Sequence, residues 1–283
     1  MRKAAAAAIA EVQRIEAKYS RYTEDSIISR INRAAGQEAV DVDAETAELL
    51  GFADSLWTLS GGLFDISSGV LRGAWDFKAG KLPTASVLQE LLTTVGWQHV
   101  QRQGQQVRLA LPGMELDFGG FGKEYAADRA AAVLLEHGIH HALVNLGGDL
   151  HALGARGLPE LQGAPWSVHI QHPRAESTSG DTTLAVLPLA RGGLATSGDY
   201  ERFFMVDGVR YCHVLNPRTG WPVAHWQSVT VLAVNTTTAG ALTTIAMLKG
   251  GDAIAWLQSQ GVQYLAVRHD GQVFSQGASD ARL

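Results

Sequence analysis

The sequence predicts an α+β fold, a single domain in which helices are mixed with largely antiparallel sheets. Some segments carry apolar residues at helical spacing, and other short apolar runs are bounded by turn residues. Two Asp-Gly pairs join such runs as tight β-hairpin turns do. Strands and helices do not alternate in the βαβ order of a parallel sheet. With 283 residues, 46% of them hydrophobic, the chain can bury a sizeable core.

The expected helices begin and end at capping signals. The N-terminal segment predicts an amphipathic helix whose inward face carries Ile9, Val12, Ile15 and Tyr19. Asp43 can cap a helix over residues 44–59, which Gly61 and Gly62 end. The remaining helices are expected at 84–94, after the turn that ends at Lys123 with Gly138 as the stop, at 238–248 and at 253–258.

Strands are expected where short apolar runs lie between turn residues. They cover a hairpin of 97–101 with 106–110, then 114–118, 142–146, 166–171, 183–187, 202–206, 211–214 and 229–234, and a last hairpin around Asp270-Gly271. The pair Asp207-Gly208 predicts the turn between 202–206 and 211–214. Residues 62–77 follow neither period, so we expect an ordered loop there.

The segment from Asp117 to Asp149 predicts an opening that binds a ligand. A strand leads into a glycine-rich turn, a helix follows, and the next strand ends in Gly147-Gly148. Glycines at strand ends expose backbone N–H groups and let a ligand approach the main chain. With Asp117, Asp149 and the ammonium of Lys123, this predicts a floor for a phosphorylated ligand. The spacing fits neither the dinucleotide fingerprint nor a Walker A loop, and glycines at a helix start also serve packing.

Charge and hydropathy exclude two classes of partner. The net charge of −5 gives no electrostatic footprint for nucleic acid. No apolar run approaches the roughly 18 residues that a membrane-spanning helix needs. Charged residues follow the N-terminal alanines at once, without a cleavage site or a lipobox cysteine. We therefore expect the chain as given to be cytoplasmic, and periplasmic only if it is a trimmed form.

Six segments, in this order along the chain, resemble the ApbE family of FAD:protein FMN transferases. They are S-R-Y-x-x-D-S-x-x-S-R-I-N (20–32), F-D-I-S-S-G (64–69), D-F-G-G-F-G-K-E-Y-A-A-D (117–128), V-N-L-G-G-D (144–149), A-T-S-G-D-Y-E-R (195–202) and H-V-L-N-P-R-T-G-W-P-V (213–223). Each is weak alone, whereas six in the family's order are specific. The resemblance implies one ApbE-like domain over residues 1–283. The family's opening strand is missing here, so we expect one wall of the FAD pocket to be absent or trimmed away.

The resemblance implies a transferase that splits FAD with Mg²⁺ and releases AMP. The FMN is attached by a phosphoester to a threonine of a partner flavoprotein, a modification called protein flavinylation. The FAD-binding residues would be Tyr22, Phe64, Asp65, Asp117, Lys123, Asp149 and Val229. The Gly120 carbonyl and the hydroxyls of Thr243 and Thr244 would contact the metal.

His213 is the candidate catalytic residue. Histidine titrates near neutral pH, so it can act as the general base for the hydroxyl of an acceptor threonine. Taken alone, His213 would be interpreted as a hydrogen-bonded core histidine. The flanking N-P-R-T-G segment favours the catalytic interpretation.

The helix expected at 238–248 departs from the family's pattern. Family members carry an aspartate four residues before the metal-binding threonine, and here Gly240 stands in that place before Thr244. Because glycine offers no carboxylate, we expect weak Mg²⁺ binding, with the change Gly240→Asp raising metal affinity. Two alternatives stay open: an FAD-binding protein that has lost transfer, and an FAD pyrophosphatase that releases FMN and AMP.

Overall fold

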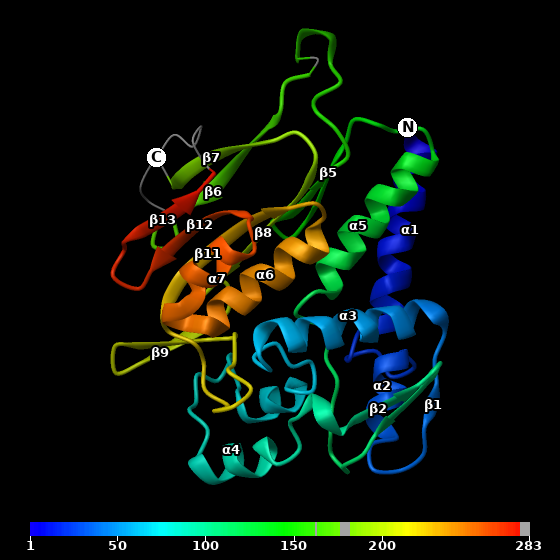
Figure 1. The fold of residues 1–283 in the computed structure, drawn as a ribbon, viewed down its shortest axis with the longest axis vertical. Helices are drawn as coiled ribbons and strands as arrows, with labels where there is room; N and C mark the ends of the chain where they lie inside the picture. The colour runs from blue at the N-terminus through cyan, green and yellow to red at the C-terminus, as the bar shows by residue number, and fades with distance from the viewer. Residues whose placement is uncertain (162, 176–181, 278–283) are drawn as a thin grey trace. The chain divides into compact units, whose positions relative to one another are not determined.

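The computed structural model describes residues 1–161, 163–175 and 182–277 (Figure 1). Contacts divide the chain into two compact units. Unit 1 comprises Met1–Arg14, Phe121–Glu201 and Ala224–Leu283, and unit 2 comprises Ile15–Gly120 and Arg202–Val223. The predicted α+β class with largely antiparallel sheets is confirmed. The single domain over residues 1–283 stays a prediction. In the described part of the chain, no helix combines the length and apolar character that crossing a membrane requires.

Unit 1 is built on a six-stranded antiparallel sheet. Its strand order is β13-β12-β11-β8-β5-β4. The strands are β4 (Leu143–Leu146), β5 (Asp149–Ala152), β8 (Gly192–Gly198), β11 (Trp226–Ala233), β12 (Gln263–Arg268) and β13 (Val273–Gln276). β11 lies in the middle, and its first six residues are buried. The sheet therefore separates two faces that are each covered by other elements.

Helices cover one face of this sheet. α5 (Gly122–Glu136) packs on β4 and β5, and α6 (Thr236–Lys249) packs on β8, β11 and α5 (Figure 1). α7 (Ala253–Ser259) follows α6 after the short turn η4 (Gly250–Asp252), and α1 (Arg2–Tyr19) is the N-terminal helix. Because α6 is covered on several sides, most of its residues are buried.

A two-stranded sheet covers the opposite face. β6 (Trp166–Gln171) pairs with β7 (Thr183–Leu189), after a short 3₁₀ turn η3 (Pro159–Leu161). Side chains alternate between the faces of a strand. The residues on this side form one apolar cluster made of Leu150, Ala152, Val168, Ile170, Ala185, Leu187, Leu189, Leu194 and Leu265. This cluster is the core on that face of the sheet.

The glycines of β8 explain why a strand forms where the sequence analysis expected none. A Cβ on Gly193 would lie 2.2 Å from the backbone nitrogen of Thr236, at the start of α6. Only glycine allows the helix to approach the strand so closely. Glycine has a low strand propensity, so the segment G-G-L-A-T-S-G carries a weak strand signal in sequence. β5 and β1 (Val40–Asp41) were also missed.

Asp128 of α5 holds the first turn of α6. The backbone N–H groups of Thr236 and Thr237 donate to its two carboxylate oxygens at 2.8 Å each, and the Thr237 hydroxyl donates at 2.5 Å. His151 Nδ1 lies 2.6 Å from Asp128 Oδ1. A carboxylate at a helix N-terminus satisfies orphan donors and complements the helix dipole. This anchor sets the position of α6 against α5.

Unit 2 combines short helices with two small antiparallel sheets. One sheet has the order β1-β3-β2, with β2 at Val100–Gln103 and β3 at Gln106–Leu109, and the other pairs β9 (Phe203–Val206) with β10 (Val209–Cys212). The helices are α2 (Ile27–Arg33), α3 (Ala44–Ser60), α4 (Ala85–Leu92), η1 (Gly69–Ala74) and η2 (Trp97–His99). Asp207 and Gly208 both have positive φ, as the predicted tight turn requires.

Residues 114–118 do not form the strand that the sequence analysis expected. Only an isolated bridge links Glu115 to Ser68. The side-chain amide of Asn32 takes the place of a strand partner, because it accepts from the Leu116 N–H at 2.7 Å and donates to the Leu116 carbonyl at 3.0 Å. The segment is therefore ordered without a sheet.

Three other element predictions need correction. Ile9, expected to face inward, is exposed, because α1 is covered on its other face, where Ala4, Ala8, Ile15 and Tyr19 are buried. The first residues of the expected strand 97–101 form the 3₁₀ turn η2. β10 ends at Cys212, so His213 follows the strand instead of lying in it.

Asp43 caps α3, as predicted, and this cap gives a testable contribution to stability. Its side chain accepts from the Thr46 N–H at 3.0 Å and from the Thr46 hydroxyl at 2.6 Å. We expect Asp43→Ala to lower the free energy of unfolding by about 1 kcal/mol. Urea denaturation at neutral pH measures this, with exposed Glu48→Ala on the same helix as the control.

The same cap predicts a pH dependence. Burial acts to raise the pKa of Asp43, but hydrogen bonds from Lys18 and Thr46 outweigh it and hold the pKa at about 2. A lowered pKa means that the carboxylate stabilises the fold above the ordinary value of 3.8 and loses that effect as the pH falls toward 2. If Asp43→Ala lowered the free energy of unfolding as much at pH 2 as at pH 7, the stabilisation would not depend on the ionised carboxylate of Asp43.

Candidate functional site

The start of α5 carries a cluster of charged side chains in unit 1. Lys123 Nζ contacts Asp149 Oδ2 and lies 3.9 Å from Glu124 Oε1. Asp149, the first residue of β5, is only 3% exposed, and its Oδ1 accepts from the Thr196 N–H at 3.1 Å. The structure therefore brings together two of the predicted FAD-binding residues, Lys123 and Asp149.

Glu124 is the member of this cluster that sequence analysis did not single out. It is 7% exposed, and burial followed by the nearby Asp149 raises the pKa of its carboxyl group. Its Oε2 atom is buried and has no hydrogen-bond partner among the described residues. The only sequence signal was its place after Lys123 in the glycine-rich turn, where an acidic residue is also an ordinary helix-start residue.

The predicted metal residues of α6 lie in the same unit. Thr243 is fully buried, and its hydroxyl donates to the Gly240 carbonyl at 2.8 Å. Ser197 Oγ lies 2.8 Å from Thr243 Oγ1 and 3.4 Å from the hydroxyl oxygen of half-buried Thr244. Ser197 lies within the quoted segment 195–202, but nothing in the sequence distinguished it from its neighbours. Three hydroxyls therefore meet between β8 and α6.

Gly240 faces Glu124 across the contact between α6 and α5. A Cβ built on Gly240 would lie 2.5 Å from Glu124 Cγ, 2.9 Å from its Cδ and 3.0 Å from its Oε1. The Glu124 side chain thus occupies the space into which a residue at position 240 would project. The expectation that Gly240→Asp raises metal affinity stays a prediction, and an aspartate at position 240 would require the Glu124 side chain to move.

In unit 2, Asp117 lies between two arginines. Its Oδ2 is 3.2 Å from Arg72 Nε and 3.5 Å from Arg21 Nη1, and its Oδ1 accepts from the Gly119 N–H at 2.8 Å. Arg21 also donates to the Gly69 carbonyl at 2.8 Å. The sequence pattern pointed to Asp117 but to neither arginine, although Arg21 lies in the segment 20–32 that resembles the family. Both arginines therefore hold Asp117 in place, and guanidinium groups are also suited to bind a phosphate.

Phe64 and Gly120 lie against one another in unit 2. A Cβ on Gly120 would lie 2.8 Å from Phe64 Cζ, so the ring needs a glycine at this position. Asp65 is buried, and its oxygens accept from the Ser67 N–H at 2.8 Å, the Ser67 hydroxyl at 2.6 Å and the Trp97 N–H at 2.9 Å. Both carboxylate oxygens of Asp65 therefore brace the loop.

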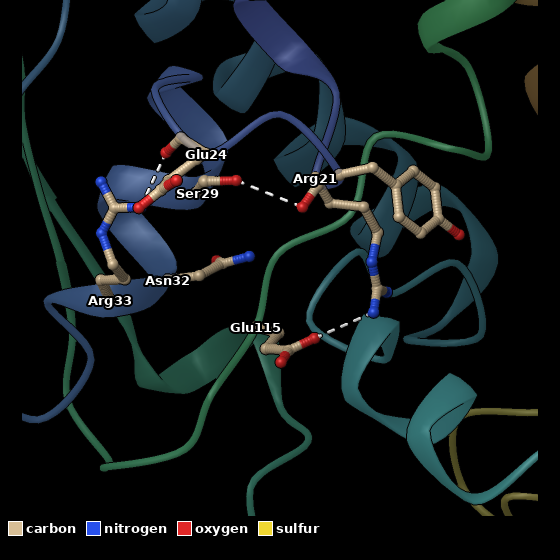
Figure 2. A pocket seen from close by; sticks show the side chains of 7 residues that line it. Arg21, Glu24, Ser29, Asn32, Arg33 and Glu115 are labelled. Atoms are coloured by element: carbon tan, nitrogen blue, oxygen red, sulfur yellow. Dashed lines mark hydrogen bonds and ion pairs between the residues drawn. The ribbon is translucent and has the colours of Figure 1, made fainter.

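Tyr22 is 80% exposed, beside a polar pocket of about 300 Å³ in the same unit (Figure 2). The guanidinium of Arg21 lies 5.6 Å from the Tyr22 ring centre, and Arg21 Nη2 is 3.2 Å from Glu115 Oε2. The pocket is lined by Arg21, Tyr22, Glu24, Ser29, Asn32, Arg33 and Glu115. Figure 2 shows Arg33 donating to the Glu24 carbonyl at 2.7 Å. An exposed aromatic ring can stack on a planar ligand.

The two remaining predicted residues differ in accessibility. His213 is half-buried just after β10, and its N–H donates to the Arg202 carbonyl at 3.0 Å. Val229 is fully buried in β11, where it pairs with Ser197 and Ala266. Val229 offers no exposed surface to a ligand, so its role stays a prediction that the geometry does not support.

The glycine turns are less open to ligands than the sequence analysis expected. The N–H of Gly119 donates to Asp117, and the N–H of Gly148 donates to the Asn145 side chain at 3.0 Å. Those two backbone donors are already satisfied. The positive φ angles of Gly147 and Gly148, 61° and 95°, instead shape a turn that brings Lys123 beside Gly147.

Comparison with known proteins gives one consistent result. The model of the ApbE family matches residues 1–266. The chain is 35% identical over 254 residues to the FAD:protein FMN transferase of Treponema pallidum, covering 84% of this chain and 69% of that protein. It is 31% identical over 265 residues to the FAD:protein FMN transferase of Salmonella typhimurium, covering 90% of this chain and 74% of that protein.

Solved structures agree with these relatives. The ApbE protein of Thermotoga maritima superimposes with a TM-score of 0.88 at 33% identity, over 98% of this chain and 89% of that chain. The flavin transferase ApbE of Vibrio cholerae gives a TM-score of 0.86 at 26% identity, over 99% and 90%. The resemblance found in the six sequence segments is thereby confirmed, and this chain belongs to the ApbE family.

Proposed function

We propose that this protein is an FAD:protein FMN transferase, which splits FAD and joins FMN to a threonine of a partner flavoprotein. Its membership of a family whose similar relatives carry that name supports the proposal. The observation that carries it in this chain is the cluster at the start of α5, where exposed Lys123 contacts buried Asp149 and lies 3.9 Å from buried Glu124. Such a cluster suits the handling of a charged phosphate group.

The reaction conserves its atoms without a further reactant. The threonine oxygen attacks the phosphorus on the riboflavin side of FAD, and the bond from that phosphorus to the oxygen of the AMP phosphate breaks. The hydroxyl proton passes to His213, which acts as the general base, and AMP leaves. Lys123 neutralises charge on the phosphates, and the exposed ring of Tyr22 stacks on a planar ring of FAD.

The oxygen-rich residues of unit 1 fit a Mg²⁺ ion. The donors are the carboxylates of Glu124 and Asp149 and the hydroxyls of Ser197 and Thr244, with no histidine or cysteine among them. Mg²⁺ prefers such hard oxygen ligands and usually binds through one or two carboxylates together with substrate phosphates. When bound, the ion would supply positive charge to the pyrophosphate.

Mass spectrometry of an acceptor domain tests the function. The protein is incubated with FAD and an acceptor flavoprotein domain that carries the target threonine, with and without Mg²⁺. We expect a covalent FMN increment on the acceptor and an equal amount of AMP, both dependent on Mg²⁺. An acceptor with threonine replaced by valine is the control and should stay unlabelled.

Two other results would replace the proposal. FAD that stays intact, with no AMP released, would indicate a flavin-binding protein without transfer, the alternative that Gly240 favours. AMP and free FMN without labelling of the acceptor would indicate a pyrophosphatase.

A further inference from the structure

The carboxylates at the start of α5 lack a full set of cationic partners in this structure. Glu124 and Asp149 are both more than nine-tenths buried, and they face one ammonium group, that of Lys123. Lys123 contacts Asp149 directly and lies 3.9 Å from the nearer oxygen of Glu124. Burying a carboxylate is unfavourable unless it is paired with a cation or fully hydrogen-bonded. The carboxyl groups of Glu124 and Asp149 therefore share the ammonium group of Lys123, and burial together with the nearby Asp149 raises the pKa of Glu124.

The second carboxyl oxygen of Glu124, Oε2, is the atom that lacks an interaction partner. Oε2 is buried, and within the described residues it has no hydrogen-bond partner. Native structures satisfy nearly all buried polar atoms, so each exception calls for a physical reason, such as an ion that the structure does not contain.

The surroundings specify the kind of cation. In the described part of the chain, no group of three or more His, Cys, Asp or Glu side chains is placed to hold a metal. A cation here would therefore take two carboxylates and complete its coordination with hydroxyl, water or phosphate oxygens. That donor set suits Mg²⁺ or Mn²⁺ better than Zn²⁺, which prefers sulfur and nitrogen ligands.

A second, independent observation concerns Gly240 of α6, which leaves room for the carboxylate of Glu124. The Cγ, Cδ and Oε1 atoms of Glu124 all lie within 3.0 Å of a Cβ built on Gly240. A side chain at position 240 of α6 and the Glu124 carboxylate of α5 could therefore not both occupy this space.

We propose that Glu124 is a ligand of the divalent cation in this protein, supplying from α5 the carboxylate that α6 lacks at Gly240. The inference rests on the proposed metal-dependent function. It names one residue as a metal ligand and adds no step to the reaction. The carboxylate that Gly240 does not supply then comes from the neighbouring helix.

Equilibrium binding of Mn²⁺ tests the proposal without using the reaction. Electron paramagnetic resonance measures free Mn²⁺ as it is titrated into the protein, alone and with ADP as a pyrophosphate ligand. We expect Glu124→Gln to weaken Mn²⁺ binding by at least about tenfold, because an amide has no charge. The matched control is Glu136→Gln, an exposed residue at the other end of α5, which should bind Mn²⁺ like the native protein.

A pair of exchanges between the two helices tests the shared space. Gly240→Asp alone should not tighten Mn²⁺ binding, because Glu124 blocks the new side chain. Glu124→Gly with Gly240→Asp should restore most of the affinity that Glu124→Gly loses, because the carboxylate then enters the same space from α6. The thermal midpoint without metal shows that each variant folds. Glu124→Gln should stay close to the native value, because burial raises the pKa of Glu124 and an amide resembles a protonated carboxyl group in shape and charge.

The outcomes separate the inference from the function. Native-like Mn²⁺ affinity in Glu124→Gln would overturn the inference, even if FMN transfer takes place. Failure of the double exchange to recover affinity, in a folded variant, would overturn the placement opposite Gly240. Glu124-dependent Mn²⁺ binding in a protein that transfers no FMN would uphold the inference and reject the proposed function.

Discussion

The change His213→Ala is expected to lower the rate of FMN transfer by about 10²–10⁴-fold, the usual contribution of a general base. His213 is half-buried after β10, and its backbone is fixed by a hydrogen bond from its N–H to the Arg202 carbonyl. The alanine variant keeps that bond and loses only the imidazole. Affinity for FAD, measured by flavin fluorescence, should therefore change much less than the rate.

The control for this experiment is His137→Ala. His137 is exposed at the end of α5, with its ring directed at the Val133 carbonyl of its own helix. It should transfer FMN at the native rate. A His213→Ala variant that labels the acceptor as fast as the native protein would show that another group accepts the proton. A histidine that acts only in packing would instead lower the thermal midpoint of the variant.

The change Asp128→Ala is expected to lower the free energy of unfolding by about 3 kcal/mol, because it leaves buried donors without an acceptor. Those donors are the two backbone N–H groups that begin α6 and the Thr237 hydroxyl. One helical turn along each helix from this anchor, Glu124 meets Gly240. The same variant should therefore weaken Mn²⁺ binding as α6 loses its fixed position.

The pH dependence of this effect has a definite sign. Burial acts to raise the pKa of Asp128, but hydrogen bonds from His151, Thr237 and Thr236 outweigh it and lower the pKa. The stabilisation by Asp128 is therefore present above the ordinary value of 3.8 and is lost as the pH falls through the lowered pKa. Urea denaturation at pH 7 and near pH 3 should show the difference between native and variant protein shrinking in acid.

Asp252→Ala is the matched control for Asp128→Ala. Asp252 also precedes a helix, α7, but it is exposed and its side chain makes no capping hydrogen bond. Its removal should change the free energy of unfolding by less than about 0.5 kcal/mol. Equal losses for both variants would contradict the anchoring role of Asp128.

Local patterns in the sequence were enough to predict most elements. Asp43 predicted the start of α3, because a capping side chain acts on backbone groups only three residues away. Asp207-Gly208 predicted the β9–β10 turn for the same local reason. The six short segments predicted the family. Each of these signals lies within a few residues of its consequence.

The elements that the sequence did not predict depend on contacts with distant parts of the chain. β8 forms from a glycine-rich segment because α6 must pack within reach of its backbone. Residues 114–118 form no strand because the amide of Asn32, over 80 positions away, binds their backbone. Neither partner can be recognised from the segment itself, since the contact exists only after distant parts of the chain have come together.

The candidate site divides along the same line. The sequence by itself determined the family and predicted the chemistry: Lys123, Asp149, Asp117 and His213 stand in segments whose residue types indicate phosphate binding and a general base. Only the tertiary structure decided how charge is arranged, because it placed Glu124 of α5 in the space above Gly240 of α6, 116 positions away. Read alone, Gly240 meant a lost carboxylate. Packing of the two helices brings the Glu124 carboxylate of α5 to this place. The space that glycine leaves on one helix is filled by a side chain of the neighbouring helix.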